Sequence, residues 1–350
     1  MASPATQPTI RAWTSKTTGP PREALTLQTA RPAPPPPTGN NILIKVSYAS
    51  LNPADLFFIR CLPPWLPFRS SPVYGLDLCG EVIATGPAVT RTTVGEKVSG
   101  AMGLAEVTAG MGGLAEVISV DAGLVAKIPD ETKLEMKKTV GAMGIAGQTA
   151  LMMIKSAGVR AGQTVLVNGA SGGVGSLAVQ ICKGIGARVV GVCSGRNGGF
   201  VKGLGADEII DYKAYQPLED FLATRFLHHE LDVILDCAGS QELYSNSPRY
   251  LKEQGGKFVT CVGGWSQGVI PFVRNKLRPV ILGGTPRPYH LFLLGAQGVF
   301  AEEIADYVEK GMIKDGPIDS EFDFEHVVEA YERLATGRAR GKIVVKVASD

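Results

Sequence analysis

Apolar and polar positions follow two patterns along the chain. Up to about residue 128, short β-type runs such as 41–48, 80–84 and 96–98 stand between glycines and prolines, which predicts an all-β segment. From Gln163 on, continuous apolar runs alternate with helical patterns. The runs predicted as strands are 164–167, 188–193, 208–210, 231–235 and 257–262. Because unbroken apolar strands are typical of a parallel sheet buried on both faces, we expect an α/β protein with a mostly-β part and a doubly wound parallel sheet.

The end of the chain is expected to return to the first part. A sixth strand is predicted near 280–282, a helix at 301–310 and a closing strand at 343–347. A chain of 350 residues also exceeds the ~250 to 300 residues at which one core stops growing. We therefore expect two domains, the first of them discontinuous. The expected bounds are 1–133 and 289–350 for the first domain and 134–288 for the second.

Composition narrows the class of ligand. Hydrophobic residues make up 45% of the chain and charged residues 19%, which indicates a folded protein with a large core. Lys and Arg (35) nearly balance Asp and Glu (33), and no dense basic run occurs, so we expect a small-molecule substrate and no nucleic acid. The long uncharged stretches 139–154 and 161–182 are interrupted by glycine and polar residues. Neither predicts a membrane span.

Cysteines and histidines are not arranged as metal ligands. The adjacent His228 and His229 cannot both face one ion from a regular helix, and we expect no metal site. Scattered cysteines suit a reducing compartment, so the cytoplasm is the expected location. Arg11 and Lys16, with no acid before Glu23, faintly suggest an organelle presequence, but a polar tail entering a first strand is favoured. The six cysteines are Cys61, Cys79, Cys182, Cys193, Cys237 and Cys261.

A glycine-rich turn follows the first strand of the predicted parallel sheet. The segment VLVNGASGGVGSLAVQ (165–180) has small residues at the GxGxxG spacing, with alanine in the first position. Such residues allow a tight turn and let backbone N–H groups approach a pyrophosphate at the start of a helix. The strand before and the helix after favour a dinucleotide site over a merely structural turn. The residues expected to bind the cofactor here are Ala170, Ser171, Gly172, Gly173, Val174 and Gly175.

The end of the second strand indicates which dinucleotide binds. An acid normally holds the ribose hydroxyls there, but this chain has Ser194, Arg196 and Asn197 and no acid. Arginine pairs with phosphate through two hydrogen bonds and serine donates to it, whereas a carboxylate would repel it. We therefore expect NADPH. The alternative is that Arg196 is an ordinary exposed residue of a loop.

Several ordered motifs occur together in one known family. They are SLNPADLFF (50–58), PVYGLDLCGEVIATG (72–86), NGASGGVGSLAVQ (168–180), LGADEIIDY (204–212) and GKIVVKV (341–347). On these residues the chain resembles the medium-chain dehydrogenase/reductase superfamily, and within it the zinc-independent quinone oxidoreductase and enoyl reductase branch, which is zeta-crystallin-like. The similarity covers nearly the whole chain.

The resemblance implies a GroES-like catalytic domain, built from both chain ends, and a Rossmann domain, with the nicotinamide in the cleft between them. It implies that Asn52 and Thr149 lie beside the nicotinamide as catalytic residues and that Tyr212 touches the 2′-phosphate. Val262 and Gly263 are expected to complete the cofactor site. Simpler alternatives stay open: a turn before a proline for Asn52, and a strand-end aromatic residue for Tyr212.

The resemblance also bears on metal and mechanism. Zinc-dependent members of the superfamily carry a cysteine ligand where this chain has residues 51–53 and a histidine near 73–76, so a zinc-independent enzyme is implied. Without a metal, hydride transfer is easiest to an acceptor polarised by conjugation, such as a quinone or an α,β-unsaturated carbonyl or enoyl compound. Some enoyl reductases of the superfamily use a tyrosine shortly after the NPxD motif (52–55 here) as proton donor, but in this chain the residues that follow directly, 56–65, contain no tyrosine. The proton donor is left open between water, Lys342 and Tyr74.

Two other functions and two further features stay open. The chain is alternatively a trans-acting enoyl reductase or other tailoring enzyme of secondary metabolism, or a non-catalytic NADPH-binding protein. The loop 61–71, with Trp65 and Phe68, forms either an apolar wall for the acceptor or part of the core. Family members commonly pair through an edge of the Rossmann sheet, so we expect a homodimer, with 280–284 as the candidate edge.

Overall fold

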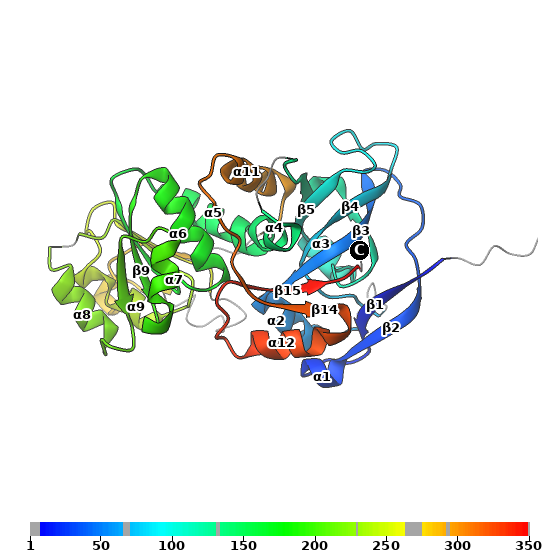
Figure 1. The fold of residues 1–350 in the computed structure, drawn as a ribbon. Helices are drawn as coiled ribbons and strands as arrows, with labels where there is room; N and C mark the ends of the chain where they lie inside the picture. Colours follow the sequence, from blue (N-terminus) through cyan, green and yellow to red (C-terminus); the bar gives the residue numbers. More distant parts are fainter. Residues whose placement is uncertain are drawn as a thin grey trace, which may run out of the picture. The chain divides into compact units, whose positions relative to one another are not determined.

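The computed structural model describes residues 8–65, 71–130, 134–228, 230–262, 275–291 and 295–348. The chain forms two compact units, coloured along the sequence in Figure 1. The first consists of Met1–Gln148, Gly295–Glu309 and Gly316–Asp350, and the second of Thr149–Leu294 and Lys310–Asp315. The domain bounds that the sequence suggests, 1–133 with 289–350 and 134–288, stay a prediction.

A seven-stranded sheet dominates the described part of the first unit. Its order is β14-β15-β3-β4-β5-β7, and β6 also pairs with β3. The last strand, β15, is antiparallel to β3, with Ile343 opposite Leu51, so the two ends of the chain share one sheet. A separate antiparallel pair joins β1 (Thr9–Ser15) to β2 (Leu25–Pro32). The strands of the large sheet are β3 (Asn41–Leu51), β4 (Asp77–Thr85), β5 (Lys97–Ala101), β6 (Val117–Asp121), β7 (Val125–Lys127), β14 (Ile318–Asp323) and β15 (Lys342–Lys346).

Helices interrupt the segment before residue 128, so the prediction of an all-β segment is wrong there. Pro53 suits the first turn of α2, and the carboxylate of Asp55 accepts the backbone N–H of Asn52, which begins the helix. The short helix α3 follows Gly103. The helices of this unit are α1 (Pro21–Ala24), α2 (Pro53–Cys61), α3 (Leu104–Thr108), α4 (Met136–Met143), α11 (Gly298–Glu309) and α12 (Val327–Ala335), and α5 (Ile145–Ala157) continues into the second unit.

The second unit is built on a parallel sheet of order β10-β9-β8-β11-β12-β13. The residues of β11 are all buried, as the unbroken apolar pattern predicts. With the β-rich first unit, this sheet confirms the α/β fold class. The strands are β8 (Thr164–Asn168), β9 (Arg188–Cys193), β10 (Glu208–Asp211), β11 (Val233–Asp236), β12 (Lys257–Thr260) and β13 (Tyr289–Leu291). The helices are α6 (Gly173–Ile185), α7 (Gly198–Gly203), α8 (Leu218–Arg225) and α9 (Gln241–Ser245).

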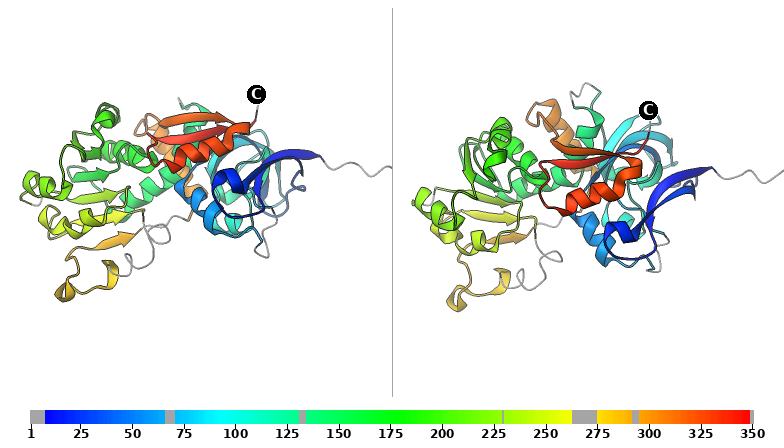
Figure 2. Two further views of the ribbon diagram at one scale, coloured as in Figure 1. Left: turned by 90° about the horizontal axis from the view of Figure 1, so that it is seen from below. Right: turned by 60° about the horizontal axis from the view of Figure 1, so that its bottom comes forward.

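The sixth strand of this sheet is β13, and the prediction of a strand near 280–282 is wrong. Those residues form a 3-10 turn, in which the backbone N–H of Leu282 donates to the carbonyl of Pro279. Gly283 then takes a left-handed conformation (φ 84°), and Ile281 is 92% exposed, so the apolar run is not a buried strand. Figure 2 shows β13, in orange, at the edge of the sheet. Within the described ranges, no helix is long and apolar enough to cross a bilayer.

Candidate functional site

The glycine-rich turn connects β8 to α6 in the second unit. The backbone N–H groups of Gly169 and Ala170 both donate to the carbonyl of Val192, at 3.1 and 3.0 Å. Gly169 has φ 75°, a left-handed backbone conformation that favours glycine. The GxGxxG spacing alone does not reveal that glycine is needed at this position. A Cβ on Gly175 would lie 2.2 Å from the carbonyl oxygen of Gly169. The third small residue of the motif is therefore a packing requirement, because α6 starts directly against the turn.

The first turn of α6 is open to an anion. Its N-cap is Gly172, which has no side chain to accept the N–H groups of the first helical residues, Gly173 and Val174. A helix start carries partial positive charge, and backbone N–H groups there bind phosphate. The side chain of Ser171 is held by Asn197, whose Nδ2 donates to its Oγ at 3.0 Å. The residues present therefore fit the pyrophosphate of a dinucleotide.

The ends of β9 and β10 bring Ser194, Arg196 and Tyr212 to one edge of the sheet. Asp211 is paired in register with Cys193, and the N–H of Tyr212 donates to the carbonyl of Cys193 at 3.3 Å. Ser194 is buried, whereas Arg196 and Tyr212 are exposed. Among the described residues, Arg196 has no ion-pair partner. Its guanidinium is thus available to a ligand phosphate.

The carboxylate of Asp211 lies close to the loop that carries Ser194 and Arg196. A Cβ on Gly195 would lie 2.4 Å from Oδ2 of Asp211, so a negative charge stands beside the loop that carries Arg196. The same charge acts on a thiol, because burial and then Asp211 raise the pKa of Cys193 to about 11. This carboxylate weakens the attraction of the loop for a 2′-phosphate.

A buried Asn168–Asp236 pair joins the ends of β8 and β11, and sequence reasoning missed it. Nδ2 of Asn168 donates to Oδ1 of Asp236 at 2.9 Å. The same carboxylate accepts the N–H groups of Ala238, Gly239 and Ser240, at 3.1, 2.9 and 2.9 Å. Burial raises the pKa of Asp236, against the effect of these hydrogen bonds. The pair holds the turn after β11 at the carboxyl edge of the sheet, where α/β proteins bind ligands.

The remaining expected residues of the second unit are Thr149, Val262 and Gly263. Thr149 is buried on α5, four residues after its first residue, Ile145. Val262 follows β12, and its N–H donates to Oγ1 of Thr260 at 3.1 Å. Gly263 lies outside the described residues. The roles of these residues toward a cofactor stay predictions.

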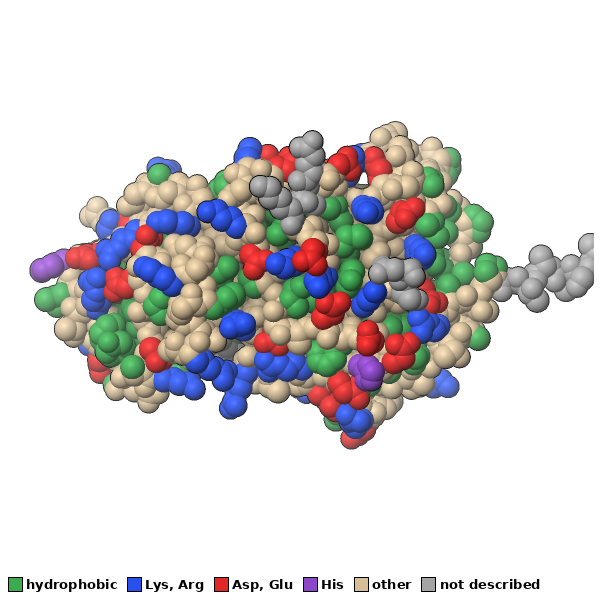
Figure 3. All heavy atoms as spheres, viewed as in Figure 1, with side chains coloured by type: hydrophobic (Ala, Val, Ile, Leu, Met, Phe, Trp, Pro, Cys, Tyr) green, Lys and Arg blue, Asp and Glu red, His purple; other side chains and the backbone are tan. Residues whose placement is uncertain are grey.

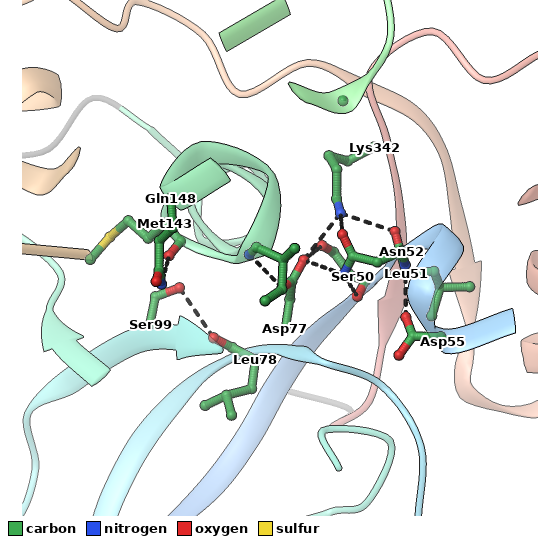
Figure 4. A network of polar contacts seen from close by, with 12 residues as sticks. Ser50, Leu51, Asn52, Asp55, Asp77, Leu78, Ser99, Met143, Gln148 and Lys342 are labelled. Atoms are coloured by element: carbon green, nitrogen blue, oxygen red, sulfur yellow. Dashed lines mark hydrogen bonds and ion pairs between the residues drawn. The ribbon is translucent and has the colours of Figure 1, made fainter. Parts of the chain in front are cut away.

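Asn52 lies in a buried polar network of the first unit (Figure 4). It is the N-cap of α2, and its backbone N–H donates to Oδ2 of Asp55 at 2.7 Å. Its side chain is held at both ends: Nδ2 donates to Oδ2 of Asp77 at 2.9 Å, and Oδ1 accepts from Nζ of Lys342 at 2.5 Å. Burial raises the pKa of Asp55 to about 7. Asn52 is therefore more than a turn residue before a proline.

Asp77 and Lys342 are the charged centre of this network. Lys342 is 6% exposed, and its ammonium lies 3.1 Å from Oδ2 of Asp77 and 3.0 Å from the carbonyl of Leu51. Asp77 is fully buried and also accepts from Oγ of Ser50 (2.6 Å) and from the N–H of Ile145 (2.7 Å). The pairing of β15 with β3 and the start of α5 bring these groups together. No sequence period links such distant positions.

Two other predictions concern side chains of the first unit. Trp65 is 77% exposed, so core packing of this residue is wrong, while an apolar wall stays a prediction. Phe68 lies outside the described residues. The hydroxyl of Tyr74 is buried and lies 2.8 Å from Oγ of Ser15. The Lys342 ammonium donates two hydrogen bonds, to Leu51 and Asn52, and is ion-paired with Asp77. Neither of these two candidate proton donors is free of internal partners.

Comparisons with known proteins agree with this architecture. A family model described as "Alcohol dehydrogenase GroES-like domain" matches residues 38–130, and one described as "Zinc-binding dehydrogenase" matches 204–345. The medium chain reductase pydE of Acremonium sp is 34% identical, over 97% of this chain and 99% of its own. The chain belongs to the medium-chain dehydrogenase/reductase superfamily. It lies in the branch of the quinone oxidoreductases and enoyl reductases.

Two further relatives support membership of this branch. The trans-enoyl reductase pgmF of Aspergillus terreus is 32% identical, over 97% of this chain and 96% of its own. The solved structure of a quinone oxidoreductase from Coxiella burnetii is 27% identical, covers 97% of this chain and all of its own, and superposes with a TM-score of 0.79. An oxidoreductase family that binds nicotinamide cofactors is thus established for this chain.

The residues at the expected zinc position do not fit zinc. In this superfamily the resemblance places a zinc ligand at residues 51–53, and here the ammonium of Lys342 lies against Asn52 and Leu51 at that place. Zinc prefers sulfur and imidazole ligands, whereas this cluster offers one carboxylate, amide and carbonyl oxygens, and a lysine. Within the part of the chain that the structure describes, no three His, Cys, Asp or Glu side chains gather as a metal site.

Proposed function

We propose that this chain is an NADPH-dependent reductase that transfers hydride to a conjugated acceptor, a quinone or an α,β-unsaturated carbonyl or enoyl compound, without a metal. The observation that carries the proposal is the start of α6, which has no side-chain cap, against the glycine turn, together with Arg196, which has no ion-pair partner in the described part of the chain. The printed names of the relatives, medium chain reductase, trans-enoyl reductase and quinone oxidoreductase, support the reaction class.

NADPH is proposed over NADH because of the groups at the ends of β9 and β10. Arg196 offers two parallel N–H donors to a 2′-phosphate, and Ser194 and Tyr212 offer hydroxyls. No acid ends β9, where a ribose-binding carboxylate would stand. The nearby carboxylate of Asp211 opposes this preference in part. The balance favours the phosphate because Arg196 is exposed at the loop, whereas Asp211 is partly buried.

The chain's own residues would bind and orient, while bound NADPH would supply the hydride. Backbone N–H groups of the glycine turn and of the first turn of α6 would hold the pyrophosphate, where Ala170 and Gly172 leave room for it, and Gly175 lets α6 pack against the turn. Asn52 and Thr149 are proposed to lie beside the reacting ring, where hydrogen-bond donors stabilise charge that develops on the acceptor oxygen. Water is the proposed proton source, since Tyr74 and Lys342 are engaged with protein partners.

Zinc independence is supported by the network around Asn52. The position is taken by an internal ammonium, so a second cation there would meet strong repulsion. A conjugated acceptor needs no Lewis acid, because its developing charge spreads onto a carbonyl oxygen. The proposed zinc independence therefore agrees with the proposed conjugated acceptor, because reduction of such an acceptor requires no Lewis acid.

A trans-acting enoyl reductase is the second candidate, favoured by the name of the Aspergillus relative. In that case the acceptor is an enoyl thioester on a carrier protein. Docking of an acidic carrier is aided by a basic patch, and on the face drawn in Figure 3 basic and acidic side chains are interspersed. We therefore keep free conjugated carbonyls as the first choice.

For assembly and location we propose a cytoplasmic homodimer. All six cysteines are free thiols, which suits a reducing compartment. The sheet edge that would meet its twofold mate is β13 (Tyr289–Leu291), and the segment 280–284 is not a strand. Light scattering tests this: the mass of two chains of 36.9 kDa supports the dimer, and the mass of one chain at micromolar protein contradicts it.

One assay tests the whole proposal. Oxidation of NADPH and NADH is followed at fixed enzyme with a set of quinones, enones and enoyl thioesters of a short soluble pantetheine analogue. We expect steady turnover with NADPH of at least one conjugated acceptor and no oxidation of saturated alcohols. Binding of NADPH without turnover of any acceptor would instead identify a non-catalytic cofactor-binding protein.

A further inference from the structure

The side-chain amide of Asn52 has only one permitted orientation. Lys342 carries hydrogen-bond donors only, and the Asp77 carboxylate carries acceptors only. In the structure the amide oxygen faces the ammonium and the amide nitrogen faces the carboxylate, at 2.5 and 2.9 Å. Rotation of the amide by half a turn would place N–H against ammonium and oxygen against carboxylate. Both contacts would then be repulsive, so the two charges lock the amide.

The ammonium of Lys342 is enclosed by oxygen atoms of the protein. Its contacts are Oδ1 of Asn52, the carbonyl of Leu51 and Oδ2 of Asp77, at 2.5, 3.0 and 3.1 Å. The stem of Lys342 is also packed, because a Cβ on Gly141 of α4 would lie 3.0 Å from its Cγ. A buried cation with three oxygen partners is fixed in place, unlike an exposed lysine.

The network gives one N–H of the Asn52 amide a strong protein acceptor and the other only a weak one. Nδ2 of Asn52 has two N–H groups and donates to Oδ2 of Asp77 at 2.9 Å. Among the described residues, its other acceptor is the carbonyl of Ser50, at 3.5 Å. That distance is too long for a strong bond. The ammonium at Oδ1 draws electron density from the amide and so strengthens the remaining N–H as a donor.

We propose that Lys342 is a positioning residue: with Asp77, its ammonium fixes and polarises the Asn52 amide so that one N–H is presented to an oxygen of the bound acceptor or nicotinamide. This inference rests on the proposed function, because it assigns Asn52 to the reacting groups. In this proposal Lys342 itself transfers no proton, since its ammonium donates to the Leu51 carbonyl and to Oδ1 of Asn52 and is ion-paired with Asp77. A merely structural ion pair is the competing explanation.

A double-mutant cycle with Asn52→Ala and Lys342→Met distinguishes a positioning role of Lys342 from a merely structural ion pair. If Lys342 acts through Asn52, each single variant lowers kcat by about 10- to 100-fold, and the double variant falls no further than Asn52→Ala alone. KM and the Kd for NADPH change less than kcat. Lys346→Met, on the same strand, is the matched control and keeps wild-type kcat. Additive losses in the double variant, or an unchanged kcat for folded Lys342→Met, would overturn the proposal.

Chemical rescue shows whether a loss of activity comes from the missing ammonium rather than from misfolding. Lys342→Ala removes the atoms of one propylammonium ion, and added n-propylammonium is expected to restore about tenfold in kcat, while the neutral alcohol n-propanol, which is of similar size, restores none. Equal rescue by both additives would indicate filling of space and contradict a role for the charge. A folded, NADPH-binding Lys342→Ala variant with no rescue would contradict it as well.

NMR of the Asn52 side chain needs no turnover, so it tests this proposal independently of the proposed function. In protein labelled with ¹⁵N-asparagine, the side-chain N–H resonances of Asn52 report the environment of its amide. We expect these resonances to shift or broaden in Lys342→Met and to stay in place in Lys346→Met. If no acceptor is reduced, the proposed function fails, yet this shift still supports the locked amide. Unchanged resonances in Lys342→Met would overturn it.

Discussion

The ammonium of Lys342 lies 2.5 Å from the amide oxygen of Asn52, although the two residues are 290 positions apart in the chain. The contact exists because β15 pairs antiparallel with β3, which sets Ile343 opposite Leu51. The C-terminal strand is therefore part of the candidate site rather than a mere closing strand. Loss of Lys342 from this strand would leave Asp77 as a buried charge without its cation.

Arg196 tests the choice of cofactor. Replacement by glutamate places a carboxylate against the 2′-phosphate, and we expect NADPH binding to weaken by roughly 1 to 3 kcal/mol while NADH binding changes little. Arg196→Gln, which removes the charge but keeps hydrogen-bond donors, is expected to lose less. Fluorescence titration with each dinucleotide gives the two Kd values. Equal loss of both cofactors would refute the assignment of this arginine to the phosphate.

Asp211 gives a prediction of opposite sign at the same edge of the sheet. Asp211→Asn removes the negative charge beside Gly195 and keeps an oxygen that accepts the N–H of Lys213. We expect NADPH to bind about two- to tenfold more tightly, because a like charge beside the phosphate is removed, and NADH to bind as before. The same titration measures it, at low and at high salt. Weaker NADPH binding in this variant would contradict the placement of the phosphate.

Gly175 tests the packing of the glycine turn. A methyl group there would lie 2.2 Å from the carbonyl oxygen of Gly169, so Gly175→Ala must displace backbone. We expect a loss of about 1 to 3 kcal/mol in the free energy of unfolding, together with loss of NADPH binding. The control is Gly199→Ala on α7, where a Cβ meets nothing within 4 Å and the exchange should stabilise by up to about 1 kcal/mol. Denaturant unfolding measures both, and equal effects would contradict the account.

Asp55 predicts a dependence of stability on pH. Burial raises its pKa from 3.8 to about 7, so folding takes up a proton between these values and the free energy of unfolding falls as the pH rises through them. Asp77 and Lys342 act on the same carboxyl in opposite directions. Asp55→Asn keeps an acceptor for the N–H of Asn52 and lacks the titration. Relative to wild type, this variant should gain about 1 to 3 kcal/mol between pH 5 and pH 8 in denaturant unfolding. A constant difference would contradict it.

Local patterns and long-range contacts differ in how well the sequence predicts them. Unbroken apolar runs predicted β8, β9 and β11, because a strand buried on both faces leaves a direct trace in the sequence. The pentapeptide GLAEV has no such fixed meaning: at 103–107 it enters a helix, and at 113–117 it leads into β6. Its conformation depends on tertiary packing rather than on propensity.

The candidate site also has a part that the sequence predicts and a part that it does not. The glycine turn is a local motif, so its position follows from the sequence, whereas the need for glycine at Gly169 appears only in the backbone angles. The network of Asn52, Asp77 and Lys342 depends on the pairing of distant strands, and no spacing along the chain indicates it. The run at 280–282 misled because an apolar triplet before glycines also suits an exposed turn.

Metal removal tests the claim that an internal ammonium stands at the expected zinc position. Prolonged dialysis against a chelator is expected to leave turnover of the conjugated acceptor unchanged, because no step requires a bound metal. A zinc-dependent alcohol dehydrogenase treated in parallel is the control and should lose activity. Elemental analysis gives the metal content before and after. Stoichiometric zinc in the purified protein, with activity lost on its removal and restored on its return, would contradict the claim.

The most direct test of the central claim is the fate of the transferred hydrogen. NADPH that carries deuterium at both hydrogen positions of the reactive carbon of the nicotinamide is turned over with an enone, and the product is analysed by mass spectrometry and NMR. We expect one deuterium per product molecule, at the carbon β to the carbonyl, and much less product when deuterated NADH replaces NADPH. A reduced product without deuterium, or no reduction of any quinone, enone or enoyl thioester, would contradict the proposal that this chain is an NADPH-dependent reductase of conjugated acceptors.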